Sequence, residues 1–425
     1  MKMKYTILGI VTIILVITVV VVLFNCGNNA DEDILINEDN IRISITKIRD
    51  KKDEFCIELS VRNYSEDTKI VHCGTNSYNC NSVNGYMNNE GYLNIRVEAG
   101  KKETGTITFK RDRLDLYGID EIKEVQLGIY VQNDATKEFV YYSPITVQVS
   151  KNYDKVDNKS LFSKHMLELD ELEYFCDEEL YSYNDIVVKS AAFISNEDGG
   201  KSVLIEVVNN STKISYVGIS EVAVNRLLLP ELEEKKLRIN PGKTRIIEYD
   251  LGDVISIEKL RLMGFDKMLD FDCNLTLWDS EEIINQTMIN IVNPDVEKYT
   301  ELEGTEVFNK NGIRIVSKGF NNSYSISDDY VYALFLIENN TSEDISFTNK
   351  SWYMHFEEGS YEIEIPRCDV PRGYKYLQDI EIYIPWIESD MEKVENINKA
   401  EFSLKIMNED NEVIFEPEIT INKGD

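Results

Sequence analysis

Histidine and cysteine, the usual zinc ligands, are sparse in this chain and do not complete a site. His72, Cys73 and Cys80 could supply three zinc ligands. A structural zinc site needs four ligands, however, and two to four residues usually separate its paired cysteines. The spacing therefore argues against zinc.

An acidic stretch has the spacing of a calcium-binding loop. Its oxygen-bearing side chains occupy positions 1, 3, 5 and 12 of such a loop: Asp270, Asp272, Asn274 and Glu281. Position 6 is Leu275, where the sharp turn of the loop requires glycine. Residues Leu275–Trp278 also fit a strand that runs into a hairpin. We predict no metal site and no cofactor.

The histidines give no sign of catalysis. Only His72, His165 and His355 are present, each in a different sequence context, and none lies near a nucleophile elbow, a phosphate loop or a paired-histidine motif. Acidic residues are so common that no carboxylate pair stands out. We predict no catalytic residue and no enzymatic activity, with an enzyme on a sandwich scaffold as the alternative.

One stretch has the composition of a contact surface. Residues 72–92 concentrate Tyr, Asn, Ser and Gly, the amphipathic and adaptable mixture that suits a contact loop. We expect Ser82–Tyr86 to form a strand, which leaves two flanking loops bearing Tyr78 and Tyr92. These two tyrosines are the predicted binding residues, and a mobile insertion in an Asn-rich protein is the alternative.

Length and charge limit the possible partners. The chain has 425 residues, which favours several domains, and its formal net charge is −31. Nucleic acid is excluded as a partner because phosphate binding depends on clustered Lys and Arg. Hydrophobic residues make up 43% of the chain, so packed cores rather than an acidic disordered polymer are expected.

The N-terminal segment predicts attachment to a membrane. Lys2 and Lys4 precede Tyr5–Phe24, an apolar run of 20 residues that is long enough to span about 30 Å of hydrocarbon as a helix. By the positive-inside rule, the residues after Phe24 lie outside the cytoplasmic membrane. We therefore expect residues 1–26 to anchor the protein to the extracytoplasmic face of the cell membrane.

Two kinds of anchor fit the segment. The Leu23–Cys26 sequence resembles the lipobox of bacterial lipoproteins, in which a cysteine such as Cys26 is lipidated after signal cleavage, although Phe24 and Asn25 replace the small residues expected there. The run also exceeds the 7–15 apolar residues of a cleavable signal. An uncleaved helix and a lipoprotein both remain open.

Six cysteines follow the anchor, where disulfides can form: Cys56, Cys73, Cys80, Cys176, Cys273 and Cys368. Cys73 and Cys80 are close enough to bridge a loop. No cysteine has a counterpart in all three copies of the repeat described next, so a shared disulfide framework is excluded. Unpaired thiols are the expectation.

The same landmarks occur three times along the chain. An alternating strand runs into a polar turn at VRNYS, VVNNS and IENNT, which aligns Asn63, Asn209 and Asn339. A turn glycine follows each of them, and a short strand precedes each: Gly100, Gly242 and Gly373, and Ile41–Ile43, Ile186–Val188 and Ile313–Ile315. Landmarks repeated in order indicate one structural unit present in three copies.

The repeated unit has the pattern of a β-sandwich. Apolar residues alternate along its strands, and turn signals recur every 8–15 residues. We predict an all-β fold of three tandem sandwiches over 34–150, 180–297 and 304–425, with 151–179 as a linker containing one short helix at most. Ile43, Val188 and Ile315 should be equivalent and face inward, and Tyr332–Ile337, apolar on both faces, should be a central strand or face a neighbouring domain.

The chain resembles the tandem immunoglobulin-like domains of Gram-positive lipoproteins and membrane-anchored proteins, which are mostly of unassigned function. Four motifs carry the resemblance: the strand opening, the Val-x-Asn-x-Ser turn, the Gly-Lys turn and the Ile-x-x-Val-x-Leu segment at Ile122–Leu127. The resemblance implies immunoglobulin-like sandwiches and an exposed, non-enzymatic role. We expect a tethered binding or spacer module for an envelope or extracellular protein or a glycan. An accessory or sensor subunit of an envelope complex is the alternative.

Overall fold

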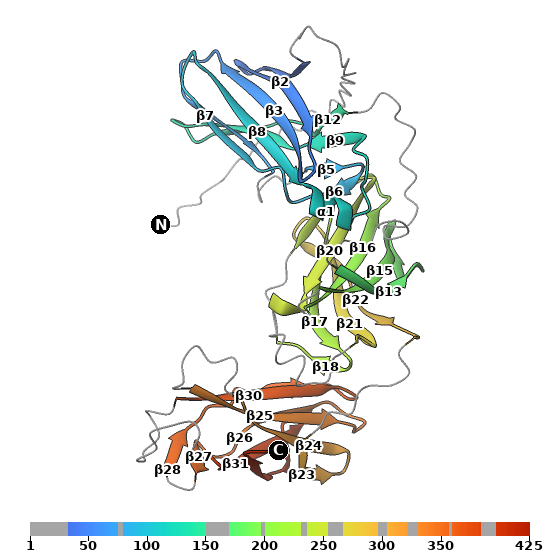
Figure 1. The fold of residues 1–425 in the computed structure, drawn as a ribbon, viewed down its shortest axis with the longest axis vertical. Helices are drawn as coiled ribbons and strands as arrows, with labels where there is room; N and C mark the ends of the chain where they lie inside the picture. The colour runs from blue at the N-terminus through green and yellow to red at the C-terminus, as the bar shows by residue number, and fades with distance from the viewer. Residues whose placement is uncertain are drawn as a thin grey trace, which may run out of the picture. The chain divides into compact units, whose positions relative to one another are not determined.

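The computed structural model describes ten stretches of the chain: 33–74, 80–149, 170–196, 200–230, 236–253, 267–295, 304–321, 330–356, 359–383 and 397–425. Within them the protein is nearly all β, as predicted (Figure 1). The helical elements described are one short α-helix, α1 (Arg111–Leu116), and one 3-10 turn, η2 (Leu251–Asp253). The described residues form two compact units. The first comprises residues up to 167 with 208–213 and 238–246, and the second comprises the remainder.

The first unit contains two four-stranded antiparallel sheets. One has the order β1 (Asp33–Glu38), β2 (Ile41–Asp50), β3 (Glu54–Asn63), β8 (Lys102–Lys110) (Figure 1). The other has the order β11 (Phe139–Tyr141), β10 (Ile129–Asn133), β4 (Lys69–Cys73), β7 (Leu93–Val97). A further set of strands has the order β12 (Ile145–Gln148), β9 (Glu124–Leu127), β5 (Ser82–Val83), β6 (Tyr86–Met87), β20 (Lys243–Asp250), and β6 pairs with Thr244 at the start of β20.

Strands β7 and β8 approach closely across the core of the first unit. A Cβ atom built on Gly105 of β8 would lie 2.4 Å from Cδ1 of Ile95 and 2.8 Å from Cδ1 of Leu93, both on β7. A larger residue at position 105 would therefore displace the ends of these two side chains. Phe55 and Phe109 fill the core beside it and are fully buried. The two four-stranded sheets thus pack face to face.

The second unit holds three groups of strands. The first comprises β13 (Asp170–Cys176), β14 (Tyr181–Tyr183), β15 (Ile186–Asn196) and β16 (Lys201–Asn209). The second has the order β22 (Glu282–Val292), β21 (Asp270–Asp279), β17 (Ser215–Val224), β18 (Leu227–Leu228), β30 (Lys375–Tyr383), β25 (Tyr330–Asn339), β24 (Ile313–Asn321), β23 (Thr305–Lys310). The third has the order β28 (Gly359–Glu362), β27 (Tyr353–Phe356), β31 (Lys399–Asn408), β26 (Ile345–Asn349), β29 (Cys368–Val370), with β32 (Val413–Phe415) and β33 (Glu418–Asn422) on β31.

The C-terminal residues, from 304 onward, enclose one apolar core between two sheets. Phe335 of β25, Phe347 of β26 and Phe402 of β31 meet at its centre, with ring centroids 5.4–6.2 Å apart. Strand β25 lies between β24 and β30, and Ala333–Ile337 are buried on both faces. The apolar Tyr332–Ile337 segment is therefore a central strand, one of the two predicted possibilities.

Each predicted strand opening forms a two-residue hairpin with the same register. The closing pairs are Glu38–Ile41, Tyr183–Ile186 and Lys310–Ile313. The turn residues between them all have positive φ: Asp39 and Asn40, Asn184 and Asp185, and Asn311 and Gly312. Asn, Asp and Gly tolerate this left-handed conformation, which a two-residue hairpin requires. Ile43, Val188 and Ile315 follow these turns and are completely buried, as predicted.

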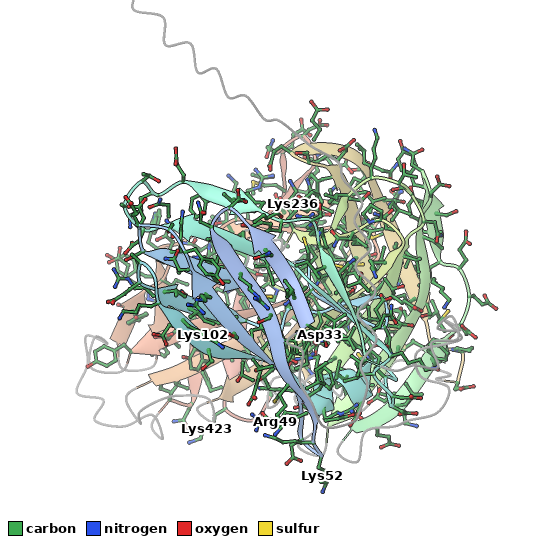
Figure 2. The ribbon with its side chains drawn as sticks, turned by 90° about the horizontal axis from the view of Figure 1, so that it is seen from above. Asp33, Arg49, Lys52, Lys102, Lys236 and Lys423 are labelled. Carbon is green, nitrogen blue, oxygen red and sulfur yellow. The ribbon has the colours of Figure 1, made fainter. Side chains whose placement is uncertain are left out.

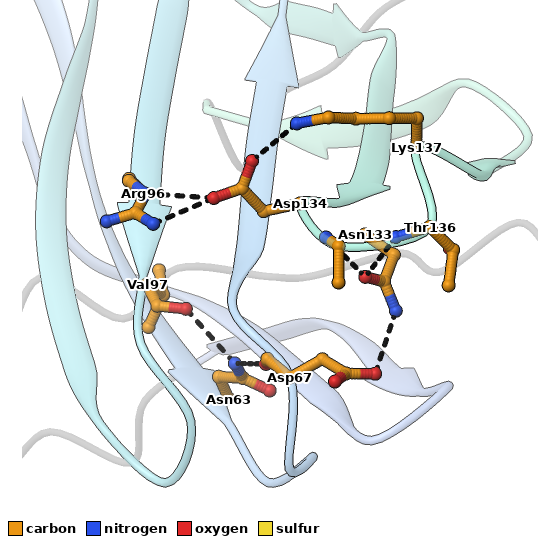
Figure 3. A network of polar contacts seen from close by, with 9 residues as sticks. Asn63, Asp67, Arg96, Val97, Asn133, Asp134, Thr136 and Lys137 are labelled. Atoms are coloured by element: carbon orange, nitrogen blue, oxygen red, sulfur yellow. Dashed lines mark hydrogen bonds and ion pairs between the residues drawn. The ribbon is translucent and has the colours of Figure 1, made fainter.

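The aligned asparagines make equivalent hydrogen bonds. Each is fully buried, and its Nδ2 donates to the main-chain oxygen four residues later and to one some 30 residues later: Asp67 and Val97 for Asn63, Lys213 and Ile239 for Asn209, Glu343 and Val370 for Asn339. Ile239 ends β19 (Leu237–Ile239). Figure 3 shows the bonds of Asn63. The amide side chain replaces main-chain partners where each strand ends.

The hydroxyl residue two positions after each asparagine completes the turn. The main-chain nitrogen and hydroxyl of Ser65 donate to Asn63 Oδ1 at 3.0 and 2.7 Å. Ser211 and Thr341 make the same two bonds to Asn209 and Asn339. The following turn glycines, Gly100, Gly242 and Gly373, all have positive φ. The Asn-x-Ser/Thr signal thus encodes one turn geometry at three places.

The structure differs from the sequence predictions in two details. Strand β13 lies inside the stretch predicted as a linker with at most one short helix, and its residues pair with β15. Ser82–Tyr86 is not one strand. Asn84 and Gly85 have positive φ and turn the chain between β5 and β6, so the segment is a tight hairpin.

The predicted anchor, Tyr5–Phe24 with Cys26, lies outside the described residues. Among the residues that are described, no helix has the length and apolar character needed to cross a membrane. All six downstream cysteines are described, and all are thiols, as expected. Burial raises the pKa of the Cys73 thiol to about 12, which makes it unreactive at neutral pH.

Candidate binding surface

Of the two tyrosines predicted to bind a partner, Tyr78 lies outside the described residues and Tyr92 is on the surface. Tyr92 immediately precedes β7, and 60% of its surface is exposed. Its hydroxyl accepts a hydrogen bond from Asn94 Nδ2 at 3.4 Å. The position of Tyr92 directs attention to the outer face of the β11-β10-β4-β7 sheet.

Strand register places several aromatic side chains in one row across this sheet. Tyr141 of β11 is opposite Tyr130 of β10, Tyr130 is opposite His72 of β4, and His72 is opposite Asn94 of β7. Directly opposed residues of neighbouring strands project on the same face. Phe139 lies two residues before Tyr141 and projects on that face as well.

The rings of this row are in contact. His72 and Tyr130 stack with centroids 4.6 Å apart and an interplanar angle of 12°, and Tyr130 and Tyr141 stack at 5.2 Å. Phe139 lies 5.9 Å from Tyr130 and 6.1 Å from Tyr141. We call His72, Tyr92, Tyr130, Phe139 and Tyr141 the aromatic face.

Exposure is greatest at β11, the edge strand of the sheet. Phe139, Val140 and Tyr141 are 48%, 39% and 52% exposed, whereas Tyr130 is buried beneath its neighbours. Edge strands are normally protected by charged side chains, prolines or bulges. An edge strand made of three exposed apolar residues is instead typical of a surface that a partner covers.

His72 lies under this surface as a neutral ring. Burial lowers its pKa, so the imidazole is uncharged at neutral pH. Its Nε2 atom is buried and has no hydrogen-bond partner among the described residues. In this setting His72 supports the ring of Tyr130 by stacking.

Charged residues border the aromatic face beyond β10. Arg96 of β7 donates to Asp134 Oδ2 from Nη2 at 2.7 Å, and Lys137 Nζ lies 2.8 Å from Asp134 Oδ1 (Figure 3). Asn133 Oδ1 accepts from the main-chain nitrogens of Ala135 and Thr136, which closes the turn leading to β11. A rigid apolar centre with a polar border is the usual arrangement of a protein interface.

The described residues offer no competing metal site. Within the ten described stretches, no group of three or more His, Cys, Asp or Glu side chains could hold a metal ion. The residues of the proposed calcium loop belong to β21 and to the turn after it, and Leu275 is a buried strand residue, as predicted.

Sequence reasoning missed most of the aromatic face. It singled out Tyr92 and considered His72 as a zinc ligand, as a catalytic histidine and as the start of the 72–92 stretch. It missed Tyr130 and Tyr141 because they are distant from residues 72–92 along the chain. The run Phe139–Tyr142, four apolar residues directly before a Ser-Pro turn, was the available signal. Its exposure follows from the position of β11 at the sheet edge, which the run alone does not reveal.

Comparisons with known proteins add no family. No family model matches the chain, and no curated protein matches it. Among solved structures, a transglutaminase from red sea bream shares 8% identity over 70% of this chain, with a TM-score of 0.16. This chain covers 37% of that enzyme, little more than a third of its length. A protein of unknown function from Porphyromonas gingivalis W83 shares 11% identity over 60% of this chain and 100% of its own, with a TM-score of 0.17. These low scores carry no argument about fold or function.

Proposed function

We propose that this protein is a non-enzymatic binding module, built from three immunoglobulin-like sandwiches and held at the extracytoplasmic face of the cell membrane by residues 1–26. The observation that carries the proposal is the exposed apolar edge strand β11 with the stacked rings beside it. Three equivalent Asn-centred turns and hairpins support the threefold repeat.

The aromatic face favours a protein partner over a glycan. A sugar ring stacks on an exposed aromatic face, but Tyr130 and His72 stack on each other and Tyr130 is buried. What remains available is one side of Tyr141, the ring of Phe139 and the open edge of β11. Exposed aromatic side chains around an unpaired strand edge suit protein docking.

We expect the double variant Phe139→Ala/Tyr141→Ala to lose partner binding while remaining folded. Together these rings supply the exposed apolar centre of the surface, so capture of a protein partner from native envelopes should weaken roughly 100-fold. Tyr92→Ala should have a smaller effect because Tyr92 lies at the border. The measurement is the affinity of the full-length chain in detergent for the captured partner.

Tyr64→Ala is the matched control. Tyr64 is 49% exposed and carries the Arg62 guanidinium 5.3 Å from its ring centroid, so it resembles the test residues in size and exposure. It is not part of the aromatic face, and its removal should leave capture unchanged. Equal binding by the double variant and the control would reject the surface. Release of the captured material by a free sugar would identify a glycan and reject a protein partner.

The location has its own test. Lys2 and Lys4 before the apolar run predict that protease added to intact spheroplasts digests the folded part. Complete protection until the cells are lysed would place the protein inside. Lipid labelling that is lost in Cys26→Ala would identify a lipoprotein, and unlabelled wild-type protein would identify an uncleaved helix.

A further inference from the structure

The first unit contains a joint between two copies of the repeat. Strands β5 and β6 form a hairpin whose turn, Asn84 and Gly85, faces the first residues of β20. Gly85 O accepts from the main-chain nitrogen of Thr244 at 3.0 Å, and Tyr86 pairs with Thr244 in parallel register. Asn84 fixes the turn, because its Oδ1 accepts from the main-chain nitrogens of Lys123 and Glu124.

The second unit contains the same joint one repeat further on. Strand β18 follows the turn residues Asn225 and Arg226 and pairs in parallel with β30. Arg226 O accepts from the main-chain nitrogen of Lys375 at 2.8 Å, and Leu227 is the register partner of Lys375. Asn225 Oδ1 accepts from the main-chain nitrogens of Leu269 and Asp270, as Asn84 does in the first joint.

The two joints correspond residue for residue. Gly242 and Gly373 donate from their main-chain nitrogens to the main-chain oxygens of Asn209 and Asn339, which aligns Thr244 with Lys375. The same connection therefore occurs twice. In each case the second strand of a hairpin in one repeat pairs in parallel with the strand that follows the turn glycine of the next repeat.

The third copy of the repeat has the corresponding hairpin without a following repeat in the described chain. Strands β27 and β28 close at Phe356 and Gly359, and Phe356 pairs with Ala400 of β31 as Val83 pairs with Val125 of β9. Strand β28 corresponds to β6 and β18, but it is the last strand in the described order of its sheet.

Exposed aromatic residues lie beside this open edge. Trp352 and Tyr353 are 57% and 50% exposed, and with Ser360 and Tyr361 they line a groove of about 430 Å³. Exposed apolar side chains next to an unpaired strand mark a surface that another strand can cover.

The first copy of the repeat presents the complementary open edge. Strand β8 begins with Lys102, directly after Gly100 and Lys101, and it ends its described sheet beside β3. Lys102, labelled in Figure 2, and its neighbour Glu103 are exposed. Thr244 and Arg245, which occupy the same places in β20, are 3% exposed. The residues that the joint buries in the second copy are thus on the surface in the first.

We propose that two copies of this chain associate end to end, with β28 of one copy paired in parallel to β8 of the other and Gly359 opposite Lys102. We choose a second copy as the partner because the edge of β8, which follows the turn glycine Gly100, is present on this same chain. The equivalent edges of β20 and β30 already pair with a hairpin strand within the chain. This goes beyond the proposed function and does not depend on the aromatic face.

Sedimentation of the full-length protein in detergent tests the association. The wild type should gain mass with concentration, and Lys102→Pro should weaken the association at least tenfold, because it removes the N–H that corresponds to that of Thr244. A wild-type protein that stays monomeric at all concentrations would overturn the proposal.

Disulfide trapping tests the register even if Lys102→Pro fails to fold. A copy carrying Glu103→Cys, mixed with a differently tagged copy carrying Ser360→Cys, should give a crosslinked dimer on mild oxidation, since neighbouring strands bring these positions within disulfide reach. The control mixture uses a copy carrying Val413→Cys instead of Ser360→Cys, because Val413 is an exposed residue of β32. Equal crosslinking in both mixtures, or crosslinking of Ser360→Cys to a different protein, would contradict the proposal.

Discussion

Replacing Asn339 with alanine is expected to destabilise the fold of the residues from 304 onward by about 3 kcal/mol, and Asn63→Ala and Asn209→Ala should cost similar amounts around their own turns. Each substitution leaves two buried main-chain oxygens, a main-chain N–H and a hydroxyl without the partner that the amide supplied. The cost of a buried polar group without a partner exceeds the net gain from an ordinary hydrogen bond, so the three losses should be large.

Thr341→Ala is the graded comparison for Asn339→Ala. It removes one hydroxyl and keeps the amide bonds to Glu343 and Val370, so a loss of about 1 kcal/mol is expected. Urea unfolding followed by hydrogen exchange within each repeat would separate the transitions. Costs below about 1 kcal/mol for the asparagine variants, or a large cost at only one of the three sites, would contradict an equivalent turn in every repeat.

Arg245→Ala is expected to destabilise the first unit by about 3 kcal/mol. The guanidinium is 3% exposed, and its hydrogen bonds go to neutral oxygens: Arg238 O from Nε and Nη2 at 3.1 and 2.8 Å, and Asn89 Oδ1 from Nη1 at 2.6 Å. Removal of the side chain leaves the half-buried Arg238 oxygen without these donors and opens a cavity between β20 and the segment containing Asn89.

The pH dependence of this effect follows from burial. Burial lowers the pKa of Arg245 to about 10, so the folded state binds the proton less tightly than the unfolded state. The contribution of Arg245 to the free energy of unfolding therefore rises only as the pH passes above about 10. From pH 6 to 8, the difference in the free energy of unfolding between the wild type and Arg245→Ala should be constant. Arg245→Lys should recover part of the loss, because a lysine reaches fewer of the acceptors. Thermal unfolding measures these differences, and an unchanged midpoint in Arg245→Ala would refute the structural role.

Local signals explain why the strands and turns could be predicted. The bonds of Asn63 to Ser65 and Asp67 lie within five residues, so the sequence of the turn contains most of its own partners. Apolar residues at every second position also leave a direct pattern in the sequence, and those of β3 and β16 are fully buried: Ile57, Leu59 and Val61, and Val203, Ile205 and Val207. The hairpin turns at residues 39–40, 184–185 and 311–312 need residues that tolerate positive φ. The sequence has Asn, Asp or Gly at all six positions, so these turns could be predicted.

Nonlocal pairing explains what could not be predicted. Strand β13 is acidic and aromatic without clear alternation, and only its pairing with β15 makes it a strand. The aromatic face depends on the registers of β10 with β4 and β11, which bring Tyr130 and Tyr141 beside His72. The joints at Thr244 and Lys375 depend on parallel pairs between repeats, and residue order within one repeat does not indicate them.

The most direct test of the binding function is hydroxyl-radical footprinting of the full-length protein, with and without its captured partner. The account predicts that Phe139 and Tyr141 lose most of their reactivity on binding, that Tyr92 loses some, and that Tyr64 is unchanged. Unchanged reactivity of Phe139 and Tyr141 in a saturated complex, with protection elsewhere on the chain, would contradict the account.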